Sequence, residues 1–301
     1  MGHEANSSLR ALVQAQQPRY TKAIVEAGVR SPLGAKKTWV IVEYSDDVNV
    51  YSKFFNPEYA QVLSSLTDKG KSGYRYVEEI VSELLNEYNQ ILILGIRDAD
   101  YTRYESTEHQ FPDNIFVTDH RDLEMMMLAA PSVPNALEQW DTEFSIKLGE
   151  CRPLVRTIGY MRIFNHIKNI GFDFRKWFKT NVVWNQETHQ LKEDWAATLL
   201  SIFFNHSGNF DADAVSGIEK EYSQVIKDLE LEKESDYDIC QGHDVLHWLS
   251  IMMVKNDYAE SRIMRRMTDA YSYDDFRKAR LHESIKVWSN YKGVKILRDY
   301  E

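Results

Sequence analysis

Length, composition and charge set the first limits. The chain has 301 residues, of which 43% are hydrophobic and 27% are charged, as is typical of a globular protein with one large domain or two smaller ones. Its net charge of −10 argues against a nucleic-acid binder whose whole surface is positive, and its two cysteines are too few for a disulfide framework. No apolar run approaches the ~20 residues of a membrane span, and no signal-peptide pattern begins the chain, so we expect a cytoplasmic protein.

Strand-like apolar runs alternate with amphipathic segments in the first half of the chain. The predicted elements, in order, are helix 7–30, strand 38–43, helix 46–55, strand 60–66, helix 74–88, strand 90–97, strand 114–118 and helix 119–130. Continuous apolar strands that alternate with one-sided helices are typical of a parallel sheet covered on both faces. The sequence therefore predicts the α/β class, with a parallel sheet flanked by helices.

The alternation fades after residue 131, and the remaining chain is mainly helical in pattern. The helical stretches are 153–170, 190–206, 215–233, 243–256 and 258–287. We therefore expect three parts: an N-terminal helical segment (1–36), a sheet-containing domain (37–131) and a mainly α-helical C-terminal domain (132–301).

Acidic residues stand where the predicted strands end. Glu43 closes the first strand, Asp98 and Asp100 follow a later one, and Asp122 and Glu124 begin the helix after another. The carboxyl ends of parallel strands share one edge of the sheet, where ligands bind in α/β proteins. These carboxylates can therefore meet if their strands are neighbours.

Converging carboxylates repel one another unless a cation lies between them. Oxygen ligands of this kind suit Mg²⁺ or Mn²⁺, which serve phosphoryl transfer by activating the attacking oxygen and stabilising the leaving one. Taken singly, each acid also fits an ordinary role in a turn or at a helix N-terminus. Taken together on one edge, they favour a metal site.

The order of these motifs resembles the Toprim fold of topoisomerases, bacterial primases and OLD-type nucleases. It is similar in particular to a Toprim branch that includes the nuclease effector of PARIS-type anti-phage systems. The matching stretches are "IVEYSDD" with Glu43 and Asp47, "GIRDADY" with Asp98 and Asp100, "NIFVTDHRDLE" with Glu124, and a later "GHD" with His243 and Asp244. Tyr44 stands where the Toprim pattern usually has glycine.

The resemblance implies a catalytic site. Glu43, Asp98 and Asp100 would be catalytic metal ligands, with Glu43 alternatively a general base. Glu124 and Asp47 would be further ligands of the same Mg²⁺ or Mn²⁺. The resemblance also implies an ABC-type ATPase partner that restrains the nuclease, and tRNA as its target.

Basic and histidine-containing segments are candidates for contacts with substrate. Lys69 and Lys71 lie in a loop that lacks the spacing of a P-loop and could contact phosphate, or form an ordinary basic loop. The resemblance gives His243 and Asp244 a role in binding or in supporting the site. Residues 151–180 contain seven basic residues and one acid, and 261–280 contain six and three. A zinc site at Cys240, His243 and His247 lacks a fourth ligand nearby, which favours packing or capping roles.

The acidic residues at the strand ends favour a metal-dependent nuclease that cleaves phosphodiester bonds. The resemblance implies that it acts as a toxic effector in phage defence, with RNA favoured over DNA. The alternative is a regulatory module that docks on an ATPase complex without catalysis. Primase-like or ligase-like nucleotidyl transfer is a third reading, for which no zinc-binding domain or lysine nucleophile motif is evident. A homodimer is consistent with related nucleases.

Overall fold

The computed structural model describes residues 21–67, 70–88, 91–105, 111–253 and 259–298. The chain forms two compact units. Unit 1 comprises residues 1–98, 111–117 and 276–301, and unit 2 comprises residues 99–110 and 118–275. These units divide the chain at other positions than the three predicted domains, whose boundaries stay a prediction.

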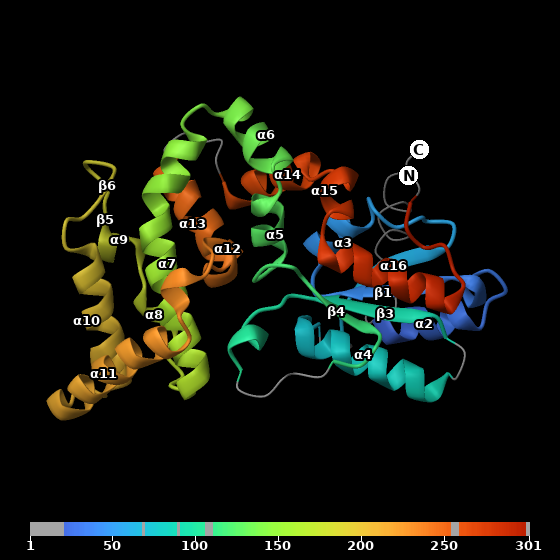
Figure 1. Cartoon of the computed structure of the whole chain (residues 1–301), viewed down its shortest axis with the longest axis horizontal. Coiled ribbons are helices and arrows are strands. Elements are labelled where there is room, and N and C mark those ends of the chain that lie inside the picture. Colours follow the sequence, from blue (N-terminus) through green and yellow to red (C-terminus); the bar gives the residue numbers. More distant parts are fainter. Residues whose placement is uncertain (1–20, 68–69, 89–90, 106–110, 254–258, 299–301) are drawn as a thin grey trace, which may run out of the picture. The chain divides into compact units, whose positions relative to one another are not determined.

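Unit 1 contains a four-stranded sheet in which all strands are parallel, in the order β2-β1-β3-β4. Its strands are β1 (Thr38–Val42), β2 (Ala60–Ser64), β3 (Ile93–Arg97) and β4 (Ile115–Val117). Its helices are α2 (Thr21–Val29), α3 (Ser45–Tyr51), α4 (Tyr74–Glu87) and α16 (Arg280–Lys292), with a 3₁₀ turn at Gly34–Lys36. Helices α2 and α4 cover one face of the sheet, and α3 and α16 lie over the other (Figure 1). The predicted parallel α/β fold is confirmed.

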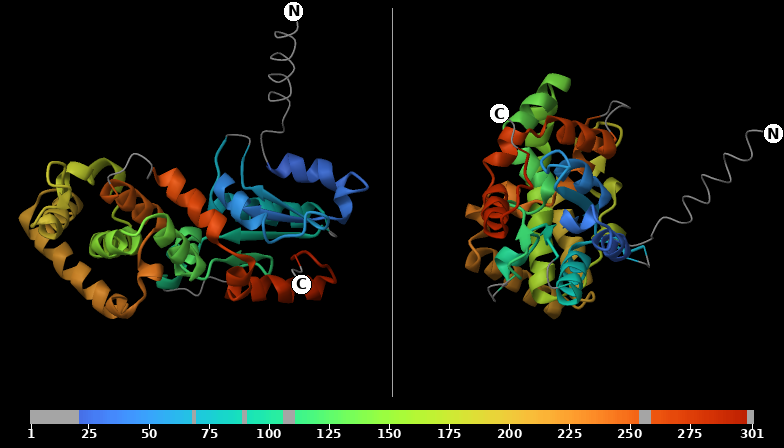
Figure 2. Two further views of the ribbon diagram at one scale, coloured as in Figure 1. Left: turned by 90° about the horizontal axis from the view of Figure 1, so that it is seen from above. Right: turned by 90° about the vertical axis from the view of Figure 1, so that its right-hand side faces the viewer.

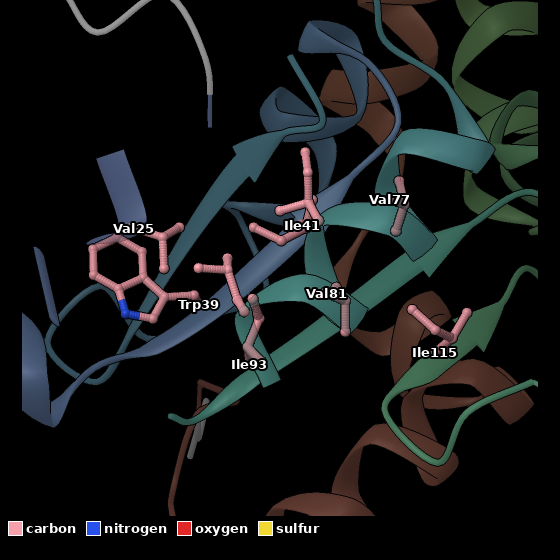
Figure 3. Packing of buried hydrophobic residues seen from close by; sticks show 9 residues of the cluster. Val25, Trp39, Ile41, Val77, Val81, Ile93 and Ile115 are labelled. Carbon is pink, nitrogen blue, oxygen red and sulfur yellow. The ribbon is translucent and has the colours of Figure 1, made fainter. Parts of the chain in front are cut away.

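The core of unit 1 forms where α4 meets the sheet. The apolar stripe predicted on this helix is buried at Val77, Ile80, Val81 and Leu84. It packs with strand residues, among them Trp39, Ile41, Ile93 and Ile115, as Figure 3 shows. Gly95 lets α4 approach, since a Cβ there would lie 2.6 Å from the Val77 side chain. Strands β1 and β3 are buried on both faces, and this explains their unbroken apolar runs.

The end of the chain returns to this sheet. Helix α16 packs beside β4, and Leu297 forms an antiparallel bridge with Phe55. The backbone N–H of Arg298 donates to the carbonyl of Phe54 at 2.9 Å. These contacts attach residues 276–298 to unit 1, although they follow the helical region in sequence.

Unit 2 is almost entirely helical. Its helices are α5 (Leu123–Ala129), α6 (Ser132–Trp140), α7 (Phe144–Lys168), α8 (Phe174–Trp177), α9 (Thr180–Val183), α10 (Trp195–Ser207), α11 (Ala212–Asp228), α12 (Asp236–Ile239), α13 (Gly242–Met252) and α14 (Glu260–Ala270). Short 3₁₀ turns lie at Thr102–Tyr104 and Leu231–Lys233, β5 (Trp184–Asn185) pairs with β6 (Gln190–Leu191), and α15 (Tyr273–Arg277) crosses the division between the units. The predicted helical C-terminal region is confirmed.

The long helix α7 begins nine residues before the predicted start at Pro153. Proline is favoured in the first turn of a helix, which makes it a natural predicted start. Here Pro153 lies inside the helix, where its ring removes one backbone hydrogen bond. Burial of Phe144 and Cys151, N-terminal to the proline, favours continuation of the helix. Helix α7 packs beside α13 within unit 2 (Figures 1 and 2). Within the described residues, no helix combines the length and apolar character needed to cross a membrane.

Candidate functional site

The ends of β1 and β3 bring together two of the predicted site residues. The two strands are neighbours, with Ile41 opposite Gly95. Glu43 is only 3% exposed, and its Oε1 accepts the backbone N–H of Asp98 at 2.7 Å. The acidic ends of two strands 55 residues apart in sequence therefore meet at one edge of the sheet, as predicted.

A buried arginine stabilises the same strand end. Arg97 is 4% exposed and forms an ion pair with Glu78 of α4. Its guanidinium lies 4.3 Å from the centre of the Tyr74 ring and donates through Nε to the carbonyl of Asp98 at 3.1 Å. A buried charge must be paired to be tolerated. Arg97, its charge compensated by Glu78, thus fixes the backbone at Asp98.

The loop that carries Lys71 is connected to Glu43 through Ser65. The buried Ser65 hydroxyl donates to the carbonyl of Glu43 at 3.0 Å and accepts the N–H of Gly73 at 3.0 Å. Lys71 itself is exposed, and its backbone is closed into a turn with Thr67. Lys69, the other predicted loop residue, lies outside the described residues.

Asp47 has a local role at the start of α3. Its Oδ2 accepts the backbone N–H of Tyr44 at 2.9 Å, which satisfies a donor at the helix N-terminus. The preceding Tyr44 is exposed, and its hydroxyl approaches Gly73. The predicted ligand role of Asp47 stays a prediction beside this observed hydrogen bond.

Asp100 stands in a tightly held turn of unit 2. Its φ of 45° is left-handed, which Asp tolerates better than most residues. Its N–H donates to the carbonyl of Arg121 at 2.8 Å, while the N–H of Ala99 donates to Thr118 Oγ1 at 3.0 Å. These bonds fix the Asp-x-Asp turn against the segment that leads into α5.

Asp122 connects α5 to α13 within unit 2. It is the N-cap of α5, where Oδ1 accepts the N–H of Met125 at 2.9 Å, and its Oδ2 accepts the N–H of Gly242 at 2.6 Å. Burial, followed by the nearby charge of Glu124, raises the pKa of Asp122 well above its usual value. Glycine is required at 242 because a Cβ would lie 2.3 Å from Glu124 Cβ and 2.6 Å from Asp122 Oδ1. The glycine of "GHD" therefore serves this close approach.

Replacing Asp122 with alanine is expected to destabilise unit 2 by about 2 kcal/mol. The change removes a helix cap and leaves the buried N–H of Gly242 without its acceptor. Asp122→Asn should cost less, because it keeps one acceptor oxygen for Met125. Calorimetric unfolding measures the stability of both Asp122 variants. The control is Asp211→Ala, which removes the cap of α11 at an exposed position where the carboxylate accepts a single N–H. Its expected loss of stability is about 1 kcal/mol. Equal losses for Asp122→Ala and Asp211→Ala would contradict the double role.

The remaining predicted residues, His243 and Asp244, begin α13. Asp244 forms a two-point ion pair with Arg162 of α7, with distances of 2.6 Å to Nε and 2.8 Å to Nη2. His247 Nδ1 lies 2.7 Å from Glu260 Oε1, and His243 Nδ1 lies 3.7 Å from Oε2 of the same carboxylate. Cys240 is buried, and burial raises the pKa of its thiol above the usual range, which does not favour the thiolate that zinc binds.

The structure thus brings Glu43 and Asp98 together in unit 1, and places Asp100, Glu124, His243 and Asp244 in unit 2. Among the residues that the structure describes, no three His, Cys, Asp or Glu side chains form a group able to hold a metal ion. A pair of carboxylates is nevertheless compatible with Mg²⁺, which keeps several waters and is usually bound by one or two protein carboxylates plus substrate phosphates.

The sequence reasoning missed several residues that shape these regions. Ser65 and Arg97 support the strand ends, and Arg162 pairs with Asp244. Arg121 is 1% exposed, donates to the carbonyl of Ile239 at 3.0 Å and lies 4.4 Å over the Tyr101 ring. Arg97 stands at the end of a predicted buried strand, and Arg121 stands near a predicted helix start. That position was the signal in the sequence that each arginine could be buried and paired. No local signal links Arg162 to a partner 82 residues away.

Two carboxyl-bearing strand ends of a parallel sheet can bind a hard cation and orient a phosphate beside it. A scan of protein-family models and a search of curated proteins each find no match to this sequence.

Proposed function

We propose that this protein is a metal-dependent nuclease that hydrolyses phosphodiester bonds. The observation that supports the proposal best is the hydrogen bond between Glu43 Oε1 and the Asp98 N–H at the ends of adjacent parallel strands. It holds an acidic side chain at the sheet edge where α/β proteins bind ligands.

The donor set fits Mg²⁺ or Mn²⁺. Glu43 and Asp98, the pair at the strand ends of unit 1, would be the ligands, with waters and substrate phosphates completing the coordination. The predicted ligand role of Asp100, which lies in unit 2, stays a prediction. The predicted ligand roles of Asp47, which accepts the N–H of Tyr44, and of Glu124, which lies in unit 2, stay predictions. When bound, such a metal supplies activation of the attacking water and stabilisation of the leaving oxygen.

The residues of the chain itself would hold and orient the substrate. Lys71 and the basic segments 151–180 and 261–280 would neutralise substrate phosphates. The motif resemblance adds three expectations. RNA, in particular tRNA, would be favoured over DNA as substrate, the protein would act as a cytoplasmic effector in phage defence, and an ABC-type ATPase partner would restrain it.

A second candidate is a regulatory module that docks on an ATPase complex without catalysis. It is favoured by the position of Glu43, which is 3% exposed and already bonded to the backbone of Asp98. A carboxylate in that setting can act purely to fix two strand ends. The exposed Tyr44, next to it in sequence, would then belong to the docking surface.

Metal removal separates the two candidates. Labelled RNA and DNA are incubated with the full-length protein in Mg²⁺, in Mn²⁺ and in excess EDTA. The nuclease proposal predicts cleavage with either metal, loss of cleavage in EDTA, and recovery when Mn²⁺ is added beyond the chelator. Cleavage that persists in EDTA would refute a metal-dependent mechanism.

Expression without a partner provides a second measurement. A nuclease free of its restraint should arrest cell growth in a Glu43-dependent manner. Growth that is unaffected, together with no cleavage of either nucleic acid in vitro, supports the docking module instead.

A further inference from the structure

Unit 2 contains a cavity of about 350 Å³ between α7, α8, α9 and the start of α13. These helices lie together on one side of unit 2 (Figure 1). The volume of the cavity falls within the ~300–1,000 Å³ range of small-molecule sites. The other two residues of the "GHD" motif, His243 and Asp244, line the cavity.

Three cationic side chains line the cavity, and they differ in how far their charge is compensated. Arg162 is neutralised by its two-point pair with Asp244, and its guanidinium lies 4.4 Å over the Phe174 ring. The Arg175 guanidinium is exposed and makes no hydrogen bond or ion pair with any described residue. Lys179 is also exposed, and its Nζ donates to the carbonyl of Arg175 at 2.9 Å. Arg175 and Lys179 therefore leave an excess of positive charge at this cavity.

The remaining lining is aromatic and polar. Phe174 and Trp248 are buried, while Phe178 is half-buried and lines the cavity. His247 is oriented by Glu260 through Nδ1, and Nε2 is the ring nitrogen not used in that contact. A planar ring stacks favourably on an aromatic side chain, and an anion binds between a guanidinium and an ammonium. The combination matches a ligand that carries both an aromatic base and a phosphate.

We propose that this cavity binds a nucleoside 5′-phosphate, with the phosphate at Arg175 and Lys179 and the base against Phe178. A base joined to a 5′-phosphate occurs in two kinds of ligand, a free mononucleotide and the 5′-phosphorylated end of an RNA strand. The site lies wholly in unit 2 and does not involve Glu43 or Asp98. Binding here therefore does not require the proposed metal site at Glu43 and Asp98.

Calorimetric titration of the full-length protein tests the proposal. All titrations contain EDTA, so that metal-dependent cleavage does not interfere. The probes are AMP, adenosine, inorganic phosphate, and one short RNA with a 5′-phosphate or a 5′-hydroxyl. AMP should bind at least about tenfold more tightly than adenosine or phosphate, because only AMP makes both contacts. Tighter binding of the 5′-phosphorylated RNA than of both AMP and the 5′-hydroxyl RNA would identify a strand end as the source. Equal binding of the two RNAs, with AMP binding retained, would identify a free nucleotide.

Two variants locate the binding. Arg175→Gln and Lys179→Gln should each raise the Kd of AMP by about tenfold through loss of one charge-assisted contact. Lys176→Gln removes another exposed charge, next to Arg175 on α8, but Lys176 does not line the cavity, so this variant should bind AMP like the parent. Unchanged affinity in the double variant Arg175→Gln/Lys179→Gln, or absence of binding by every probe at millimolar concentration, would overturn the proposal.

Discussion

Replacing Glu43 with glutamine is expected to reduce metal-dependent phosphodiester cleavage by about 10³-fold while the sheet stays folded. Glutamine keeps a side-chain oxygen that can accept the N–H of Asp98, so the 2.7 Å contact between the strand ends is retained. The change removes only the negative charge. The loss in rate then reports the role of that charge in holding a cation or accepting a proton.

The measurement is kcat/KM for the labelled nucleic acid in Mg²⁺, with thermal unfolding as the test of folding. Asp46→Asn is the matched control, because Asp46 is an exposed carboxylate three residues further along the chain. It should cleave at the parental rate. Asp98→Asn should resemble Glu43→Gln. Parental rates for both Glu43→Gln and Asp98→Asn would end the catalytic proposal.

Replacing Asp244 with alanine is expected to destabilise unit 2 by about 3 kcal/mol. The Arg162 side chain is 19% exposed and that of Asp244 is 13% exposed, so the pair is largely desolvated. Removal of one partner leaves the other charge uncompensated, which costs about 3–5 kcal/mol for fully buried pairs. The residual exposure places the expected loss at the low end of that range.

Calorimetric unfolding of the variants measures this loss. The double variant Arg162→Met/Asp244→Leu should recover most of the lost stability, because no unpaired charge remains. The control is Glu221→Ala, which breaks an exposed ion pair with Lys168. The Glu221 side chain is 58% exposed and that of Lys168 is 38% exposed, so the free energy of unfolding should change by no more than about 0.5 kcal/mol. If Asp244→Ala costs no more than Glu221→Ala, the α7–α13 pair does not stabilise the unit.

The sequence by itself determined the class of the fold and the positions of the acidic strand ends. The stripe from Val77 to Leu84 and the apolar runs of β1 and β3 are local patterns, and each specifies a helix or a strand from the spacing of neighbouring side chains. The end of each strand is part of the same local pattern. Glu43 and Asp98 could therefore be placed at one edge of a parallel sheet before their distance was known.

Only the tertiary structure decided which of these ends are neighbours and what else joins them. The strand order β2-β1-β3-β4 sets Glu43 beside Asp98, and long-range hydrogen bonds join Asp122 to Gly242. The pairing of Arg162 with Asp244 and the return of α16 to the sheet likewise depend on contacts between distant segments. Such contacts depend on the packing of whole faces, and the spacing of residues within one element does not encode them.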